Sequence, residues 1–501
     1  MTKRGSKGQA LVLCLLLAGA AALASLLLFN SGMLANTKTQ LQNAADAGAY
    51  SGAVMLARDH NFSAYSNRAM VANQVAVAQL VSLDSYLEDA AKTHSRLNDL
   101  VQSIQADIPT SKGMWDAGKK HRIEDVNKAY VKIAGPAVRA IDALIRAFDT
   151  AQHLHHETTA ASVMFIVDEV VQKNDPHASV STGKFQTGTT LVQVKRWRND
   201  YTARHRANDN SAAADRFANV VVSDKSTDGF TRSRLSVPLP AWSSTPKPWY
   251  CPLGIPQNTT FGFVHSGGTI LSRDKKRWLA LDATMGAGVH VCEYITFWGP
   301  VIVTVPLIDP SSTGLGGSGG AVAGRGGRYG ESTGFSGNPL STRMYGYALI
   351  NPLTLVPAQV RYQSTGPGAT LDANGGLQDN YRDIAATAAT PLNQAPERNG
   401  AQIPLTVEVQ RGQDSVRTSS QFLGGATNIR LDPALKGGTM RSLAAAQAFF
   451  YRPKQDSSAF TRNGWQRADN RAEMASLFNP YWQARLSDRS DAERLLSIGL
   501  Q

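Results

Sequence analysis

The chain has 501 residues, more than one ordinary domain needs, and 42% of them are hydrophobic, which excludes a globally disordered protein. Lysine and arginine (51) exceed aspartate and glutamate (39), and the net charge of +12 permits contact with an anionic surface or lipid without requiring it. Three cysteines are too few for a disulfide scaffold or for a zinc site made of cysteine alone.

An uncharged apolar run follows the first few residues. Ala10 to Phe29 carry no charge and, as a helix, would be about 30 Å long, the thickness of the hydrocarbon core of a bilayer. Three basic residues precede the run, and positively charged flanks stay in the cytoplasm. We therefore expect a cytoplasmic N-terminus (1–8), one transmembrane helix (9–29) and an exported remainder, as in a single-pass protein of a bacterial inner membrane.

Two kinds of processing are alternatives to a retained anchor. Cleavage after Ala24 would make the run a signal peptide, but it would leave the apolar stretch 25–29 at the new N-terminus, so the pattern favours retention. Gly8 is a candidate prepilin-type cleavage point, although Leu13 stands where an acidic residue is usual. The sequence leaves this processing open.

Helical periodicity continues beyond the apolar run and predicts an elongated helical stalk over 30–175. We expect this region to be interrupted at Pro109 and again near Gly135–Pro136, because proline removes a backbone donor.

A ladder of small residues, Ala44, Gly48 and Gly52, lets another helix approach closely. Together with Gln42 it is the candidate helix-pairing interface. The partner helix is either the next helix of the same chain or a helix of another protein.

Several stretches resemble the TadE/TadG-like family of pilus-assembly proteins, in particular its long TadG-like members. They read RGSKGQALVL at 4–13, LQNAADA at 41–47, NFSAYSNRAM at 61–70 and NPYWQARL at 479–486. The resemblance implies an inner-membrane-anchored assembly factor or minor-pilin-like subunit of a tight-adherence (Flp, type IV-like) pilus. It also implies no cofactor and, as partners, the membrane and other pilus-assembly or pilin-like proteins.

After residue 175 the sequence pattern changes to short β-branched runs separated by glycine, proline and serine. This pattern predicts a β-rich exported domain over 176–438. Gly299–Pro300 is expected to split the apolar stretch 289–308 into two strands, and 311–338, with eleven glycines, is expected to be a loop. The overall fold class is α+β. The predicted strands are Thr189–Val194, Asn219–Val222, Thr260–Val264, Val301–Ile308 and Gln402–Val409.

The last segment, 439–501, is predicted to be aromatic and helical, with a helix from Asp469 to Ile498. Its aromatic side chains are expected to anchor a core, with a docking surface as the alternative.

Cys251 and Cys292 lie in the exported part, where an oxidising compartment favours a disulfide between them. Two buried free thiols are the alternative.

Four patterns point weakly to site chemistry. The glycine motifs around Ser318 lack the helix that a phosphate or oxyanion site needs, so we reject them. Asp309–Thr313 imitates the start of a Mg²⁺-dependent adhesion site but is more simply a polar turn.

The other two patterns are a histidine cluster and a basic segment. His153, His156 and Glu157 share one helix face, which suits zinc, yet no remote ligand is identifiable. Basic residues around Trp197 suit nucleic acid, but export makes nucleic acid an improbable partner. We therefore assign no catalytic, cofactor or metal residue.

The sequence favours a structural and assembly role and no enzymatic activity. Two alternatives remain: a membrane-tethered exported enzyme of the envelope, and an adhesin or ligand-binding module that uses the β-rich domain. No set of acid, base and nucleophile can be named for the first of these.

Overall fold

The computed structural model divides the chain into two compact units, each built from segments that lie far apart in the sequence. Unit 1 comprises 1–65, 151–203 and 382–501, and unit 2 comprises 66–150 and 204–381. The structure describes residues 7–104, 122–206, 216–234, 242–244, 253–271, 277–306, 318–324, 348–350, 357–359, 369–372, 380–384, 402–419, 438–452, 473, 475–489, 491, 493 and 495.

Two long helices contribute to both units. Helix α1 runs from Lys7 to Ile104 and contains the predicted anchor, and helix α3 runs from Ile123 to Asn174. The predicted helical region is therefore confirmed where it is described, and Pro109 lies outside the described residues.

The predicted break near Gly135–Pro136 is wrong, because α3 continues through Pro136. Burial on either side of the proline offsets the lost hydrogen bond, since Ala134 and Val138 are 1% and 0% exposed.

In unit 1 an antiparallel four-stranded sheet packs with the helices around one core. The strand order is β1-β12-β13-β14, and every neighbouring pair is antiparallel. Core side chains come from α1, α3 and the sheet, for example Leu41, Val167 and Leu405. The strands are β1 (Ala178–Val180), β12 (Gln402–Gly412), β13 (Thr439–Phe450) and β14 (Trp482–Leu486).

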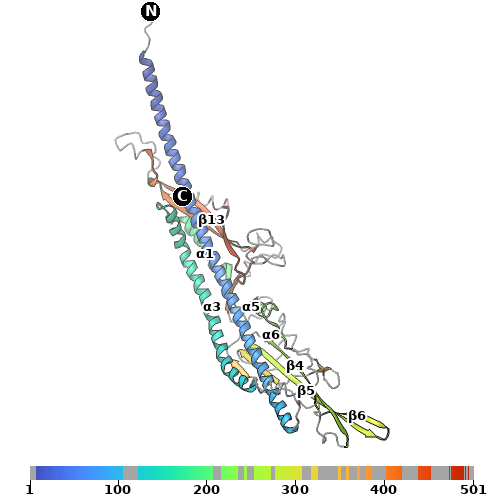
Figure 1. The fold of residues 1–501 in the computed structure, drawn as a ribbon. Coiled ribbons are helices and arrows are strands. Elements are labelled where there is room, and N and C mark those ends of the chain that lie inside the picture. Colours follow the sequence, from blue (N-terminus) through green and yellow to red (C-terminus); the bar gives the residue numbers. More distant parts are fainter. Residues whose placement is uncertain are drawn as a thin grey trace, which may run out of the picture. The chain divides into compact units, whose positions relative to one another are not determined.

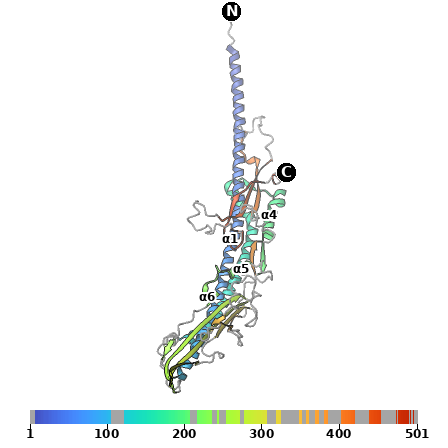
Figure 2. The same ribbon diagram turned by 90° about the vertical axis from the view of Figure 1, so that its right-hand side faces the viewer.

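Unit 2 contains a six-stranded sheet in the order β10-β7-β5-β4-β3, with β6 paired to β5. Only the β10–β7 pair is parallel among these described strands. The long strands β4 and β5 stand out in both ribbon views (Figures 1 and 2). The strands are β3 (Trp242–Ser244), β4 (Ile255–Leu271), β5 (Arg277–Thr296), β6 (Gly299–Pro306), β7 (Ser318–Gly324) and β10 (Ala369–Asp372).

Two smaller sheets of two strands each complete the described strands. They pair β2 (Thr202–Arg206) with β11 (Asn380–Ile384), and β8 (Ala348–Ile350) with β9 (Pro357–Gln359).

The α+β class is confirmed, and the predicted strands at 260–264, 301–308 and 402–409 coincide with β4, β6 and β12. The split at Gly299–Pro300 is confirmed as well, since β5 ends at Thr296 and β6 begins at Gly299.

Two predicted strands are wrong, because Thr189–Val194 and Asn219–Val222 are helical. Thr190, Val194 and Trp197 are buried at helical spacing, so packing overrides the preference of β-branched residues for strands. Phe217 and Val221 repeat this spacing. The elements are the π-helices η1 (Gln186–Thr190) and η2 (Trp197–Tyr201) and the helices α4 (Leu191–Arg196), α5 (Arg216–Val221) and α6 (Gly229–Arg232), with a 3₁₀ turn η6 (Gln413–Ser415) elsewhere.

The expected loop at 311–338 and the expected C-terminal helix each contain a strand in the structure. The glycine-rich segment 311–338 contains β7, where a methyl group added at Gly319 would overlap Ser85 O of α1, so glycine permits the contact. In the predicted C-terminal helix, Trp482–Leu486 is strand β14, because it pairs with β13; Asp491, Glu493 and Leu495 are helical.

We predict that Gly52→Ala destabilises unit 1 by about 1–3 kcal/mol, because the added methyl group would overlap Leu405 and lie 2.9 Å from Val167 Cγ2. Thermal unfolding of the full chain in detergent measures this change. Gly32→Ala is the matched control on the same helix: nothing lies within 4 Å of its added methyl group, so its stability stays equal or rises. Equal midpoints for the two variants would contradict this packing.

Candidate functional site

The apolar N-terminal part of α1 lies outside the protein's own core. It belongs to the one helix of the described residues that is long and apolar enough to cross a membrane, and none of its most apolar window is buried. Leu13 and Leu28 are 59% and 73% exposed. In both ribbon views this part of α1 has no helix or strand beside it (Figures 1 and 2).

Contact with the folded unit begins where the apolar run ends. Asn30 Nδ2 donates to Ser419 Oγ at 2.9 Å, and Ser419 N donates to Asn30 Oδ1 at 2.7 Å. A polar pair of this kind suits water or an interface better than the hydrocarbon of a bilayer. The helix therefore changes its surroundings at Asn30, consistent with membrane anchoring of the preceding residues.

The candidate pairing residues face elements of their own chain. A methyl group added at Gly48 would lie 2.7 Å from Val171 Cγ2 of α3, and Ala44 is completely buried in the same core. Gln42 accepts a hydrogen bond from Ser442 Oγ (2.6 Å) and donates to Leu443 O (3.2 Å), both on β13. Gly52 lies against Val167 and Leu405. Small residues thus serve helix packing inside unit 1, and pairing of this face with another protein stays a prediction.

Three successive residues of α1, namely Asp59, His60 and Asn61, form a polar junction in unit 1. Asp59 has no exposed surface and accepts one hydrogen bond at each oxygen, from His155 Nδ1 (2.8 Å) and His156 Nδ1 (2.7 Å) of α3. These bonds lower the pKa of Asp59 although burial opposes them, so the carboxylate is ionised and fixes α1 to α3.

His60 and Asn61 connect the same turn of α1 to η2 and β14. Trp197 Nε1 donates to His60 Nε2 at 3.0 Å, and the ring of Trp482 meets His60 edge to face with centroids 4.4 Å apart. Asn61 Nδ2 donates to Trp482 O (2.9 Å), and its Oδ1 accepts from Trp482 N (3.0 Å). The segments 61–70 and 479–486, which share the family resemblance, therefore meet at this junction.

His60 is buried, and its imidazole has an unusually low pKa. Burial lowers the pKa of His60 to about 4, despite the nearby negative charge of Asp59. The proton of the neutral ring stands on Nδ1, because Nε2 accepts from Trp197, and Nδ1 is buried without a hydrogen-bond partner. His60 is thus a neutral packing group at pH 7.

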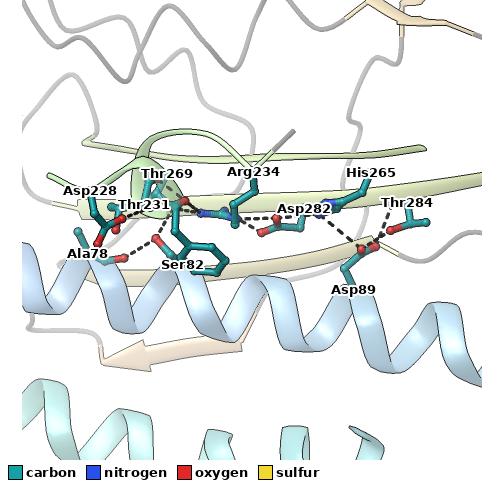
Figure 3. A network of polar contacts seen from close by, with 11 residues as sticks. Ala78, Ser82, Asp89, Asp228, Thr231, Arg234, His265, Thr269, Asp282 and Thr284 are labelled. Atoms are coloured by element: carbon teal, nitrogen blue, oxygen red, sulfur yellow. Dashed lines mark hydrogen bonds and ion pairs between the residues drawn. The ribbon is translucent and has the colours of Figure 1, made fainter. Parts of the chain in front are cut away.

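A second polar network lies in unit 2 between α1, α6 and the sheet (Figure 3). Arg234 binds Asp282 of β5 through two bonds of 2.7 Å, from Nε and Nη2, and its Nη1 donates to Thr269 Oγ1 at 3.0 Å. The hydroxyls of Thr269 and Ser82 lie 2.6 Å apart. Farther along α1, Asp89 accepts from Thr284 N (3.1 Å) and Oγ1 (2.6 Å).

The titratable groups of this network are engaged with one another. His265 Nε2 lies 3.1 Å from Asp282 Oδ1, and burial lowers the pKa of His265 to about 4. Burial raises the pKa of Asp89 to about 6, with Asp282 adding to the effect. These shifts accompany a network that joins a helix to a sheet, and the hydroxyl that lies beside a carboxylate, Thr284 Oγ1 on Asp89, makes one of these contacts.

The histidine pattern considered as a zinc site makes other contacts in the structure. His156 directs Nδ1 to Asp59 and Nε2 to Arg198 O (3.0 Å), while Glu157 pairs with Arg198 Nη2 at 2.5 Å and His153 is exposed. Within the described ranges, no three histidine, cysteine or carboxylate side chains are arranged to hold a metal ion.

The basic cluster is also part of the fold. Trp197 is completely buried and cannot stack on a base, and Arg204 pairs with Asp149 at 2.5 Å. Phe450, Phe478 and Trp482 are buried too, as expected for core aromatics. Cys292 is completely buried and disulfide-bonded. Its predicted partner Cys251 and the motif 309–313 lie outside the described residues.

Sequence reasoning missed both polar networks. A signal for the first was present, because Asp-His-Asn at 59–61 places three successive polar residues in a helix whose preceding turns are rich in alanine. For the second no local signal existed, since Arg234 and Asp282 are 48 residues apart.

Residues 8–55 match the Tad family model, described as "Putative Flp pilus-assembly TadE/G-like". This match confirms the resemblance and supports a role in Flp pilus assembly in general. No curated protein and no solved structure matches the chain.

We predict that unit 1 loses stability as the pH falls from about 6.5 to about 4. Protonation favours the unfolded state, where the pKa of histidine is about 6.5, because the pKa of His60 in the folded state is about 4. The stability is complete above pH 6.5, and the His60 share of the loss is about 3 kcal/mol. His60→Gln should flatten this dependence in denaturant titrations of the full chain. The exposed His153→Gln should keep the wild-type slope; identical slopes for all three proteins would refute the role of His60.

We also predict that Arg234→Leu destabilises unit 2 by about 3–5 kcal/mol, because it leaves Asp282 charged and buried. Arg232→Leu, which removes a more exposed pair with Asp224, should cost about 1 kcal/mol or less. Chemical denaturation of both variants gives the comparison, and similar costs would speak against a buried, charged pair.

Proposed function

We propose that the protein is a membrane-anchored, minor-pilin-like structural component of a tight-adherence Flp pilus system. Its N-terminus lies in the cytoplasm, α1 crosses the inner membrane once over residues 9–29, and the two folded units lie outside. The units make protein contacts during pilus assembly.

One observation carries this proposal: the family match and the exposed apolar helix coincide. The matched residues 8–55 include the run that is unburied among the described residues, the boundary at Asn30 and the small residues that contact α3. The matched length thus corresponds to an anchor together with its attachment to a folded unit. This arrangement supports an anchored scaffold rather than a free exported protein.

The state of the polar groups supports an assembly role over the enzyme alternative. Asp59 and Asp282 are fully engaged by basic partners, and Asp89 by Thr284. Such groups join α1 to α3 or to a sheet, whereas an active site presents an acid, base or nucleophile to a substrate.

An exposed apolar stripe on α3 is the surface in unit 1 that best suits a protein contact. Leu154 and Phe165 are 65% and 72% exposed, and Thr158 and Ala161 between them continue the stripe at helical spacing. Such a stripe is typical of helix pairing. We place the contact with another pilus component here, because the Gly48 face is already covered by α3.

We predict that Leu154→Glu/Phe165→Glu lowers recovery of other pilus subunits at least about tenfold when the tagged protein is purified from native membranes, because charge on the stripe opposes helix pairing. Thermal unfolding should stay close to wild type, since both side chains are exposed. Leu191→Glu/Val192→Glu is the matched control on an exposed part of α4. Unchanged recovery and normal piliation in the first variant would reject this contact.

A further inference from the structure

The hairpin of β5 and β6, both labelled in Figure 1, has two exposed aromatic residues in its loop. Phe297 and Trp298 form the two-residue loop between the paired residues Thr296 and Gly299, and they are 96% and 93% exposed. Their rings meet edge to face with centroids 5.7 Å apart. We call Thr296–Gly299 the aromatic tip.

The surface behind the aromatic tip is largely apolar, although Glu293 of β5 lies opposite Ile255 on β4 and Ile302 on β6. No charged residue occurs from Tyr294 to Ile308. Protein docking surfaces normally surround their apolar centre with a polar rim, whereas hydrocarbon requires no charged partner. The exposed apolar side chains on β4, β5 and β6 are Ile255, Ile295, Val301, Ile302 and Val303.

Two backbone groups of the aromatic tip bond to the tip itself. The Thr296 hydroxyl accepts a hydrogen bond from Trp298 N (3.3 Å) and donates to Gly299 O (2.7 Å). Gly299 has a φ of +115°, which only glycine adopts readily, so the turn is set by its sequence. Trp298 N and Gly299 O can therefore leave water without losing these hydrogen bonds, which favours entry into lipid.

The outer edge of β6 is poorly suited to adding a strand from another protein. Pro300 and Pro306 stand opposite Ile295 and Val289 of β5 and are six residues apart, so they have the same orientation in the ladder. Proline fits only where its missing N–H would point away from the partner strand. The free edge therefore lacks donors at both ends, which disfavours strand pairing.

From these observations we propose that the aromatic tip inserts into the interface of a lipid bilayer. Phe297 and Trp298 enter the boundary between headgroups and acyl chains, where amphipathic aromatic rings are favoured. The stretch from Tyr294 to Ile308, which carries no charge, allows binding to neutral phospholipid. The inference goes beyond the proposed pilus role and does not depend on it.

The test uses the full chain with α1 held in a phosphatidylcholine nanodisc, to which large phosphatidylcholine vesicles are added. The wild type should float with the vesicles, also at about 0.5 M salt, because screening does not weaken apolar contacts. Phe297→Ser/Trp298→Ser should reduce the floated fraction at least about tenfold. Ile133→Ser/Leu144→Ser, a pair of exposed apolar residues of α3 in the same unit, should float like wild type.

A second measurement reports where the ring lies. Acyl chains brominated in the added vesicles should quench the fluorescence of the wild type more than that of Trp298→Phe, which still floats. Failure of the wild type to float, equal flotation of the double-serine variant, or equal quenching of the two proteins would each overturn the proposal. Pairing of nanodiscs without vesicles, lost in the double-serine variant, would assign the tip to a second copy instead.

Failure of this test is distinct from failure of the proposed function. The assay contains no other pilus component, so loss of vesicle binding leaves the recovery of pilus subunits unaffected. Conversely, a protein that binds vesicles through the tip but recovers no pilus subunit would retain the lipid contact and lose the assembly role.

Discussion

One helix, α1, has to satisfy two different surroundings along its length, and the rest of unit 1 depends on how it does so. From Ala10 to Phe29 its side chains are almost all apolar and exposed, which is stable only in hydrocarbon. From Asn30 onward it bonds to the folded chain, and from Leu41 it lies in the core. Because the helix is continuous, its anchor also fixes the orientation of the core that it enters.

Packing and polar contacts divide the task of holding α1 in this core. Small residues, Gly48 and Gly52, let α3 and β12 approach closely, which gives contact area but little direction. Asp59 and Asn61 then specify the partners. The buried Asp59 carboxylate is bonded by two histidines, and the Asn61 side-chain amide is bonded to the backbone of Trp482, so few other packing arrangements would satisfy these groups. Unit 2 uses the same principle, with Arg234 and Asp282 as the specifying pair.

The sequence predicted features whose cause is local. The apolar length at 10–29, the proline-marked split at 299–300 and the β-branched run at 402–409 each specified an element that the structure contains. Errors arose where distant contacts decide: Thr189–Val194 is helical because Thr190 and Val194 are buried inside unit 1, and Trp482 is in a strand because it pairs with β13. The Asp59 junction could have been suspected from its polar residues but not its partners, since His155 and His156 are about a hundred residues away.

The most direct test of this account is the reactivity of Cys14, an exposed free thiol inside the apolar part of α1. Intact membranes containing the wild type or Cys14→Ser are treated with a water-soluble maleimide, and the labelling attributable to Cys14 is compared with that after detergent and denaturant. The account predicts that Cys14 is labelled only after the bilayer is dissolved. Equal labelling in intact membranes, or recovery of the full-length chain in the soluble fraction, would contradict it.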